Sequence, residues 1–224
     1  MKLHEFDEKY WNYYLTLESD LIKTQRYVTI DEDNYSAFSV EYAKQYQTIC
    51  SEIDVICKDY CWFLDPDTKV KNIMGYASVI LEKKPDLISR TVRVKTAASV
   101  NLHPWMDWKT DKQNPFDGCS VANNSPSWWM YYNKVKHNRT GSDSENKEFF
   151  KFANQGNTLN SLAGLFILVM YYYKDLALSE NPDNVTIPNR PSNLFEIKDW
   201  EKHFIFFNED LAMNVKKNSL IYND

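Results

Sequence analysis

The chain has few glycines and no CxxC cysteine pair, and both absences narrow the range of folds. Only 5 of its 224 residues are glycine, which disfavours a body built from many tight β-turns and favours a helical one. Its four cysteines include no CxxC pair and no Cys/His quartet with the spacing of a zinc site. No phosphate-cradling glycine loop, nucleophile elbow, HExxH helix or EF-hand pattern occurs. An ordinary NTPase, α/β-hydrolase or metalloprotease is therefore disfavoured, and neither a metal nor another cofactor is expected.

The chain also lacks an excess of positive charge and a long apolar run. Its formal net charge is −5, so any RNA binding must rest on a local basic patch. Residues 1–8 are charged and have no signal-peptide core. The longest uninterrupted apolar run, within residues 162–173, is short of the ~20 residues that a membrane span needs. A cytoplasmic protein without a membrane partner is expected.

Apolar residues recur at helical spacing over most of the chain. The pattern predicts helices over 5–26, from about 31–33 to 63, from a cap at Asp67 to about Pro85, over 125–139, and over 157–174. The helix over 157–174 is expected to be central and buried. Cys50, Cys57 and Cys61 stand at i, i+7 and i+11 and are predicted to be buried thiols on one apolar stripe.

Two regions depart from the helical pattern. Residues 91–96 alternate apolar and polar side chains like a short strand, and residues 103–108, with Pro115 and Gly118, predict an ordered, aromatic-rich loop. The segment 180–224 is expected to be an irregular appendage or to contain a short hairpin. The predicted fold is therefore all-α: one domain over 1–224, a bundle of about four to five main helices with a small irregular or β appendage.

The segment 125–139 gathers aromatic, cationic, amide and imidazole groups. Ser125 followed by Pro126 is typical of a helix start, with Ser125 as the cap and Pro126 at the first helical position. In a helix, Trp129, Asn133 and His137 stand at i, i+4 and i+8 on one face. The cations close to them are Lys134, Lys136 and Arg139. This segment is the candidate site.

Residues 132–139, Tyr-Asn-Lys-Val-Lys-His-Asn-Arg, resemble the signature helix of HEPN-type proteins, a superfamily of small all-α bundles. Many members are RNases of toxin–antitoxin, abortive-infection and other anti-phage systems. The family motif is an arginine, a polar residue (often asparagine), a short spacer and a histidine. Asn133 and His137 match it, whereas Tyr132 stands where the arginine is expected and Arg139 follows the histidine. The resemblance covers 125–174 at most.

The resemblance implies a metal-independent endoribonuclease that acts as a bacterial toxin or anti-phage effector. It also implies a homodimer in which two motif helices meet, with an antitoxin or defence-system partner. Tyr132 at the arginine position favours the alternative, a catalytically inactive HEPN-like module that binds a nucleotide, RNA or a protein. A third alternative is a purely structural helical protein.

Each candidate side chain has a chemical role in the nuclease hypothesis. His137 would be the general acid or base, and Asn133 would orient it or bind phosphate. Arg139 and Lys136 would stabilise charge on phosphoryl oxygens. Lys134 would bind RNA, and the rings of Trp129 and Tyr132 would stack on a base. Alternatively, the aromatic residues fill the core and the cations simply complement the helix dipole.

Glu52 is the further candidate, because it lies in the middle of an apolar helical pattern. A carboxylate there is costly unless it is exposed or paired. It would either face the motif helix and orient His137 or pair with Arg139, or it would lie on the solvated margin of its helix, which is the favoured interpretation.

Overall fold

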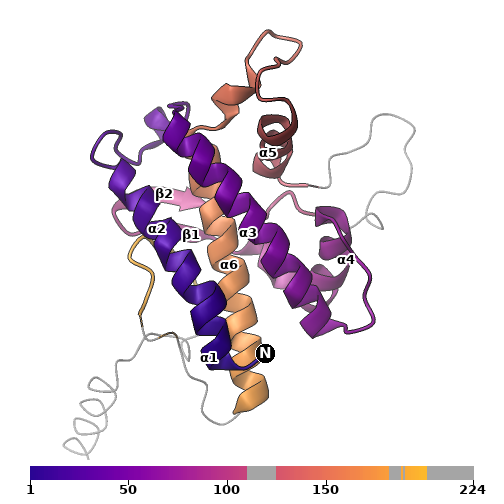
Figure 1. The fold of residues 1–224 in the computed structure, drawn as a ribbon. Helices are drawn as coiled ribbons and strands as arrows, with labels where there is room; N and C mark the ends of the chain where they lie inside the picture. The colour runs from indigo at the N-terminus through magenta and orange to yellow at the C-terminus, as the bar shows by residue number, and fades with distance from the viewer. Residues whose placement is uncertain (110–124, 182–187, 189, 201–224) are drawn as a thin grey trace, which may run out of the picture.

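The computed structural model describes residues 1–109, 125–181, 188 and 190–200. In this part of the chain, five α-helices longer than one turn pack around one core (Figure 1). Pro115 and Gly118 of the predicted loop, Cys119, and residues 201–224 of the predicted appendage lie outside the described residues. The mainly helical fold with a small β element agrees with the prediction.

The first predicted helix is confirmed as one continuous rod. It consists of α1 (Leu3–Phe6), the π-helical η1 (Asp7–Trp11) and α2 (Asn12–Thr24). Its stripe of large apolar side chains is buried, as the i, i+4, i+7 spacing predicts. The buried residues are Phe6, Tyr10, Trp11, Tyr14, Leu17 and Leu21.

The second helix, α3, spans Val40–Leu64, and its start differs from the prediction. The acidic residues expected at its beginning form a separate 3₁₀ turn, η2 (Glu32–Asn34), because the Asp31 carboxylate accepts the backbone N–H of Asp33. Ser39 then caps α3, its Oγ accepting the N–H of Tyr42 at 3.0 Å. The helix ends where predicted, since the proline after Asp65 forces that residue into an extended conformation.

The third helix, α4, spans Ile73–Lys83 and is followed by the 3₁₀ turn η3 (Pro85–Ser89). Its cap is Asn72, whose Oδ1 accepts the N–H of Gly75 at 2.9 Å. The prediction of Asp67 as the cap was therefore wrong. Asp67 belongs to the preceding turn, where its own N–H is bound by the carboxylate of Asp65.

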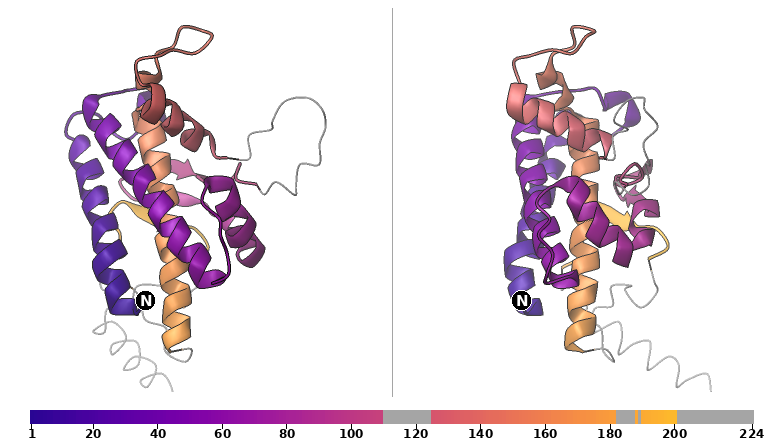
Figure 2. Two further views of the ribbon diagram at one scale, coloured as in Figure 1. Left: turned by 45° about the vertical axis from the view of Figure 1, so that its right-hand side comes forward. Right: turned by 90° about the vertical axis from the view of Figure 1, so that its right-hand side faces the viewer.

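The long helix α6 (Gln155–Glu180) forms the centre of the molecule. It lies between α2 and α3 on one side and the small sheet on the other (Figures 1 and 2). Among the described residues α6 has the length and composition of a membrane span, but 83% of its apolar window is buried inside the protein. That burial agrees with the predicted central core helix.

Three short strands form an antiparallel sheet in the order β2-β1-β3. The strands are β1 (Val92–Val94), β2 (Ala97–Leu102) and β3 (Phe195–Ile197). The predicted strand over 91–96 is confirmed by β1. In the C-terminal appendage β3 pairs with β1, with Val94 opposite Phe195, and the residues after Trp200 that the alternative hairpin would need lie outside the described part of the chain.

The predicted aromatic loop after β2 is ordered by burial of its tryptophans. Trp105 lies 4.4 Å from Trp108 and 5.2 Å from Trp128 between ring centroids. The three indole N–H groups donate to the carbonyls of Gly164, Ile73 and Pro104, respectively. A Cβ at Gly164 would lie 3.3 Å from ring atoms of both Trp105 and Trp128, so α6 needs glycine where the tryptophans meet it.

Candidate functional site

The motif helix α5 spans Ser127–Asn138 and is anchored through its aromatic side. Its N-cap is Pro126, and no side chain caps it; the prediction of Ser125 as the cap was therefore wrong. Tyr46 of α3 donates its hydroxyl to the carbonyl of Trp128. Together with the Trp128 indole bond to Pro104, this contact fixes α5 against α3 and the tryptophan loop.

Trp129 and Tyr132 are core residues, contrary to the predicted role in stacking on a base. They are only 8% and 4% exposed. The ring of Trp129 adjoins those of Trp128 and Tyr132, and the ring of Tyr132 also adjoins that of Tyr46, at centroid distances of 5.2 to 6.0 Å. Neighbouring side chains therefore occupy the positions that a base would need, as the packing alternative predicted.

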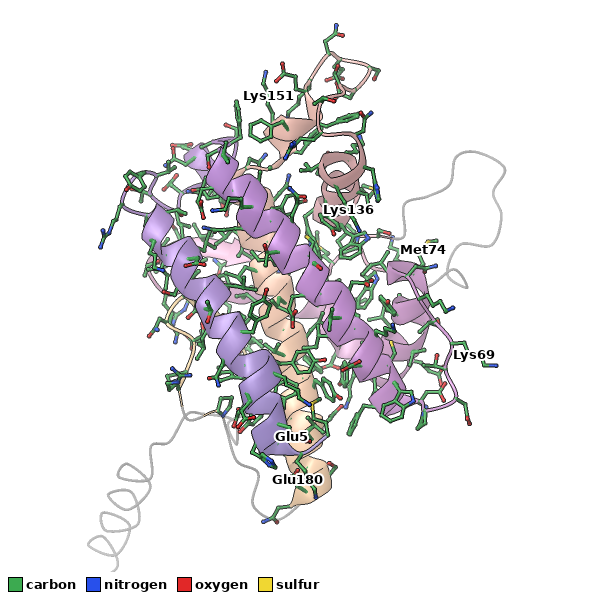
Figure 3. All side chains as sticks on the ribbon, viewed as in Figure 1. Glu5, Lys69, Met74, Lys136, Lys151 and Glu180 are labelled. Atoms are coloured by element: carbon green, nitrogen blue, oxygen red, sulfur yellow. The ribbon has the colours of Figure 1, made fainter. Side chains whose placement is uncertain are left out.

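The last turn of α5 is exposed and basic. Lys136, His137 and Arg139 are exposed, and Asn133 is half-buried. We call the three exposed side chains the basic end of α5; Lys136 is labelled in Figure 3. Among the described residues, none of the three forms a hydrogen bond or an ion pair with another residue. No carboxylate in the described part of the chain neutralises the ammonium of Lys136 or the guanidinium of Arg139, so both can meet an external anion.

The predicted catalytic residues fall on two stripes of α5. His137 lies one turn after Asn133, on the same stripe. Arg139 has helical backbone angles, φ −53° and ψ −31°, and 100° per residue places it about 160° around the axis from His137. Arg139 instead continues the stripe of Tyr132 and Lys136. The helix thus places His137 on the stripe of Asn133. It places Arg139 on the stripe of Lys136.

Lys134 is held by aromatic rings within the protein. Its Nζ lies 5.6, 5.3 and 5.5 Å from the ring centroids of Tyr131, Phe149 and Phe152, respectively. The rings of Tyr131 and Phe152 are stacked at 4.2 Å. These cation–π contacts fasten the 3₁₀ turn η5 (Phe149–Phe152) to α5. Lys134 is therefore half-buried, and its predicted role in binding RNA is correspondingly limited.

The exposed Lys136 has a cation–π contact with Tyr132, one turn earlier on α5. Its Nζ is 5.5 Å from the Tyr132 ring centroid, and its charge partly offsets the strong rise that burial gives to the pKa of the Cys50 thiol. Burial raises the pKa of Tyr132 to about 12, and the charges of Cys50 and Asp54 add to the rise. The carboxylate of α3 that approaches α5 is therefore that of Asp54, which also accepts the hydroxyl of Tyr76 at 3.1 Å.

Among the described residues Glu52 forms no hydrogen bond or ion pair with His137 or Arg139, so no contact supports the orienting or pairing role of the functional hypothesis. Burial raises the pKa of Glu52 to about 7, and the charge of Asp59 adds to the rise. The charge of Glu52 in turn helps to raise the pKa of Tyr10, whose hydroxyl donates to Asp59 at 2.5 Å. Glu52 and Asp59 are seven residues apart and share the face of α3 that meets η1.

Two acidic residues after α5, Asp143 and Glu148, interact with groups near them in the sequence. Asp143 accepts the backbone N–H groups of Glu145 and Lys147. Glu148 lies 3.8 Å from the ammonium of Lys151, which is labelled in Figure 3. Among the described residues there is no group of three or more metal-ligating side chains that could hold an ion.

Sequence reasoning missed the contacts of Phe149 and Phe152 with Lys134 of the motif helix, and the contact of Lys147 with Phe152. Lys147 lies 4.8 Å from the Phe152 ring. The cluster of aromatic residues at 149–152 was visible in the sequence, but nothing in its spacing indicates that it surrounds a lysine on an earlier helix.

Comparison of the chain with protein-family models, with curated proteins and with solved structures finds no match.

Proposed function

We propose that the protein binds RNA through the basic end of α5. One observation carries the proposal: the exposed side chains of Lys136, His137 and Arg139 lie at one helix end and form no hydrogen bond or ion pair with the described residues, on a chain of net charge −5. Charge left uncompensated on an otherwise acidic protein is what a phosphate backbone contacts. Stacking does not contribute here, because Trp129 and Tyr132 are buried.

Metal-independent cleavage of the bound RNA is the second part of the proposal, and it rests on the resemblance to HEPN-type proteins. Exposed His137 next to Asn133 is the arrangement that supports it. The imidazole would exchange a proton with the 2′-OH or the leaving oxygen, and the carboxamide would orient it. Lys136 would stabilise charge on the phosphoryl oxygens. In a homodimer, as the resemblance implies, a second copy of α5 would supply the second proton-transfer group.

The binding proposal is tested with a fluorescently labelled single-stranded RNA and the variants Lys136→Ala and Arg139→Ala. Loss of one charge-assisted contact to phosphate should weaken binding about tenfold. Lys83→Ala is the matched control, because Lys83 is an exposed lysine at the end of α4, paired with Glu82 at 3.4 Å. Binding that is equal in all four proteins would contradict the proposal and favour a helix-dipole role for the cations.

The cleavage proposal is tested by incubating total RNA with the purified protein and a chelator, and by mapping new RNA ends. His137→Ala should abolish the cleavage while it leaves the fold and most of the RNA affinity intact, since Lys136 and Arg139 remain. His4→Ala is the control, because His4 is also exposed but lies at the other end of the molecule (Figure 1).

Cleavage retained by folded His137→Ala would refute the catalytic assignment. Binding without cleavage by the wild type would leave the inactive, RNA-binding alternative. Growth arrest on expression, lost in the same variant, would support a toxin or anti-phage role.

A further inference from the structure

A second site with aromatic and cationic side chains lies at the other end of α3. Residues at the end of α3 and in the loop that leads to α4 line a pocket of about 360 Å³, within the size range of small-molecule sites. Lys69, in this loop, lies well away from Lys136 of α5 (Figure 3). The pocket is therefore separate from the basic end of α5, and the inference does not depend on the proposed function.

The aromatic wall of the pocket is Trp62, which is 63% exposed. Trp62 contrasts with the other tryptophans of the bundle, which are buried at Trp11, Trp105, Trp108, Trp128 and Trp129. A large, rigid ring left open to solvent inside a pocket offers a flat face for a planar ligand. Trp62 is not among the apolar residues through which the end of α3 packs on the core, which are Tyr60, Cys61, Phe63 and Leu64.

Three lysines line the same pocket: Lys58, Lys69 and Lys71. None of them forms an ion pair with a carboxylate in the described part of the chain. The single carboxylate in the lining belongs to Asp59, which already accepts the hydroxyl of Tyr10 at 2.5 Å. The pocket is thus a locally positive site, and it favours a ligand with negative charge.

The loop that carries two of these lysines is shaped before any ligand arrives. Thr68 donates its N–H to the carbonyl of Asp65 at 3.1 Å. Val70, between the two lysines, packs closely on Gly75 of α4. A Cβ built at Gly75 would lie 3.0 Å from the Cβ of Val70. Because backbone and packing contacts hold the loop, little ordering is needed to place the ammonium groups.

We propose that this pocket binds a nucleotide. The base stacks on the indole of Trp62, and the phosphate meets the ammonium groups of Lys69 and Lys71. Lys58 adds positive charge from α3, and the second oxygen of Asp59 and the hydroxyl of Thr68 can bond the sugar or the base edge. A flat ring joined to an anion is the ligand class that matches an exposed indole beside uncompensated lysines. The nucleotide can be free or can belong to a single strand of RNA.

The test is a calorimetric titration of the full chain with adenosine monophosphate, and separately with adenosine, inorganic phosphate and a short single-stranded RNA. Wild type should bind the nucleotide more tightly than adenosine or phosphate alone. Trp62→Ala should weaken nucleotide binding roughly 5- to 150-fold, as removal of a base–aromatic stack does. Trp62→Phe should restore part of the loss, and the double change Lys69→Ala and Lys71→Ala should reduce both the affinity and its salt dependence.

Two controls separate the site from the fold and from α5. Tyr27→Ala removes an aromatic ring that is 87% exposed on another surface and should leave nucleotide binding unchanged. Arg139→Ala tests whether the nucleotide instead uses the basic end of α5, which would overturn the proposal. Binding of the RNA but not of the mononucleotide, with the same loss in Trp62→Ala, supports the pocket with a nucleic-acid strand as its source. Equal binding by folded Trp62→Ala and wild type, or no binding of nucleotide or RNA by wild type, would overturn it.

Discussion

Glu52 is a carboxylate in a position that is costly for stability. It lies half-buried on the face of α3 that meets η1, and the structure shows no hydrogen bond or ion pair for it among the described residues. Burial and then the charge of Asp59 raise its pKa to about 7. Folded protein therefore holds the Glu52 proton more tightly than the unfolded chain, in which a glutamate titrates near pH ~4.3.

The free energy of unfolding therefore decreases as Glu52 loses its proton. The contribution of Glu52 is most favourable below pH ~4, decreases between about pH 4 and pH 7, and is constant above. Glu52→Gln should remove this decrease. The variant should match wild type near pH 4 and be more stable at pH 8, by on the order of 1–3 kcal/mol, since one pKa unit corresponds to about 1.36 kcal/mol.

Urea unfolding at the two pH values measures the difference. Glu8→Gln, at an exposed position of η1, is the control and should be neutral at both. A Glu52→Gln variant that changed the free energy of unfolding equally at pH 4 and pH 8 would show that Glu52 is already solvated or paired in the folded protein.

At the scale of elements, a buried carboxylate fastens the C-terminal strand to the helical rod. Glu18 of α2 is 1% exposed. Its carboxylate accepts the hydroxyls of Tyr14 and Ser192 and the backbone N–H groups of Asn193 and Leu194. Glu18 thus binds the segment that leads into β3 through three of its groups, and Trp11, Asn12 and Tyr14 add bonds to Arg190 and Ser192.

Glu18→Ala should therefore destabilise β3 more than the rest of the protein. Two backbone N–H groups would lose their acceptor, at a cost of about 1–3 kcal/mol for each one that stays buried. We expect faster amide hydrogen exchange at Leu194–Ile197 and a lower free energy of unfolding. Thr16→Ala, on the exposed side of α2 where Thr16 bonds only the carbonyl of Asn12, should change neither. Unchanged exchange at β3 in Glu18→Ala would mean that β1 pairing alone holds the strand.

The helices could be predicted from sequence because each shows its own apolar period. Local side chains decide where they begin, and there the prediction failed at Asp67 and Ser125, since one competing polar group can take over a cap. The pairing of β3 with β1 could not be predicted, because strands of three residues contain too little alternation to choose a partner about a hundred residues away.

The exposure of His137 and its alignment with Asn133 follow from helical spacing. The buried state of Trp129, the aromatic surroundings of Lys134 and the half-buried state of Glu52 depend on contacts between elements.

At the scale of the whole molecule, the chain separates its charges. The overall charge is −5, yet uncompensated cations remain at the end of α5 and around Trp62, at two separate places (Figure 3). A general electrostatic attraction to nucleic acid is absent at this net charge, so binding should depend on a few identifiable contacts. Each such contact releases condensed counterions from RNA and leaves a measurable dependence on salt.

The salt dependence of RNA affinity therefore tests the proposal of an RNA-binding α5 most directly. The slope of log affinity against log salt concentration is measured for wild type, for Lys136→Ala with Arg139→Ala, and for Lys83→Ala. For a single strand the slope changes by about 0.7 for each phosphate contact, so the double variant should show a slope about 1.4 smaller in magnitude, and the control the wild-type slope. A double variant with the wild-type slope and affinity would contradict the account and leave α5 as a structural helix.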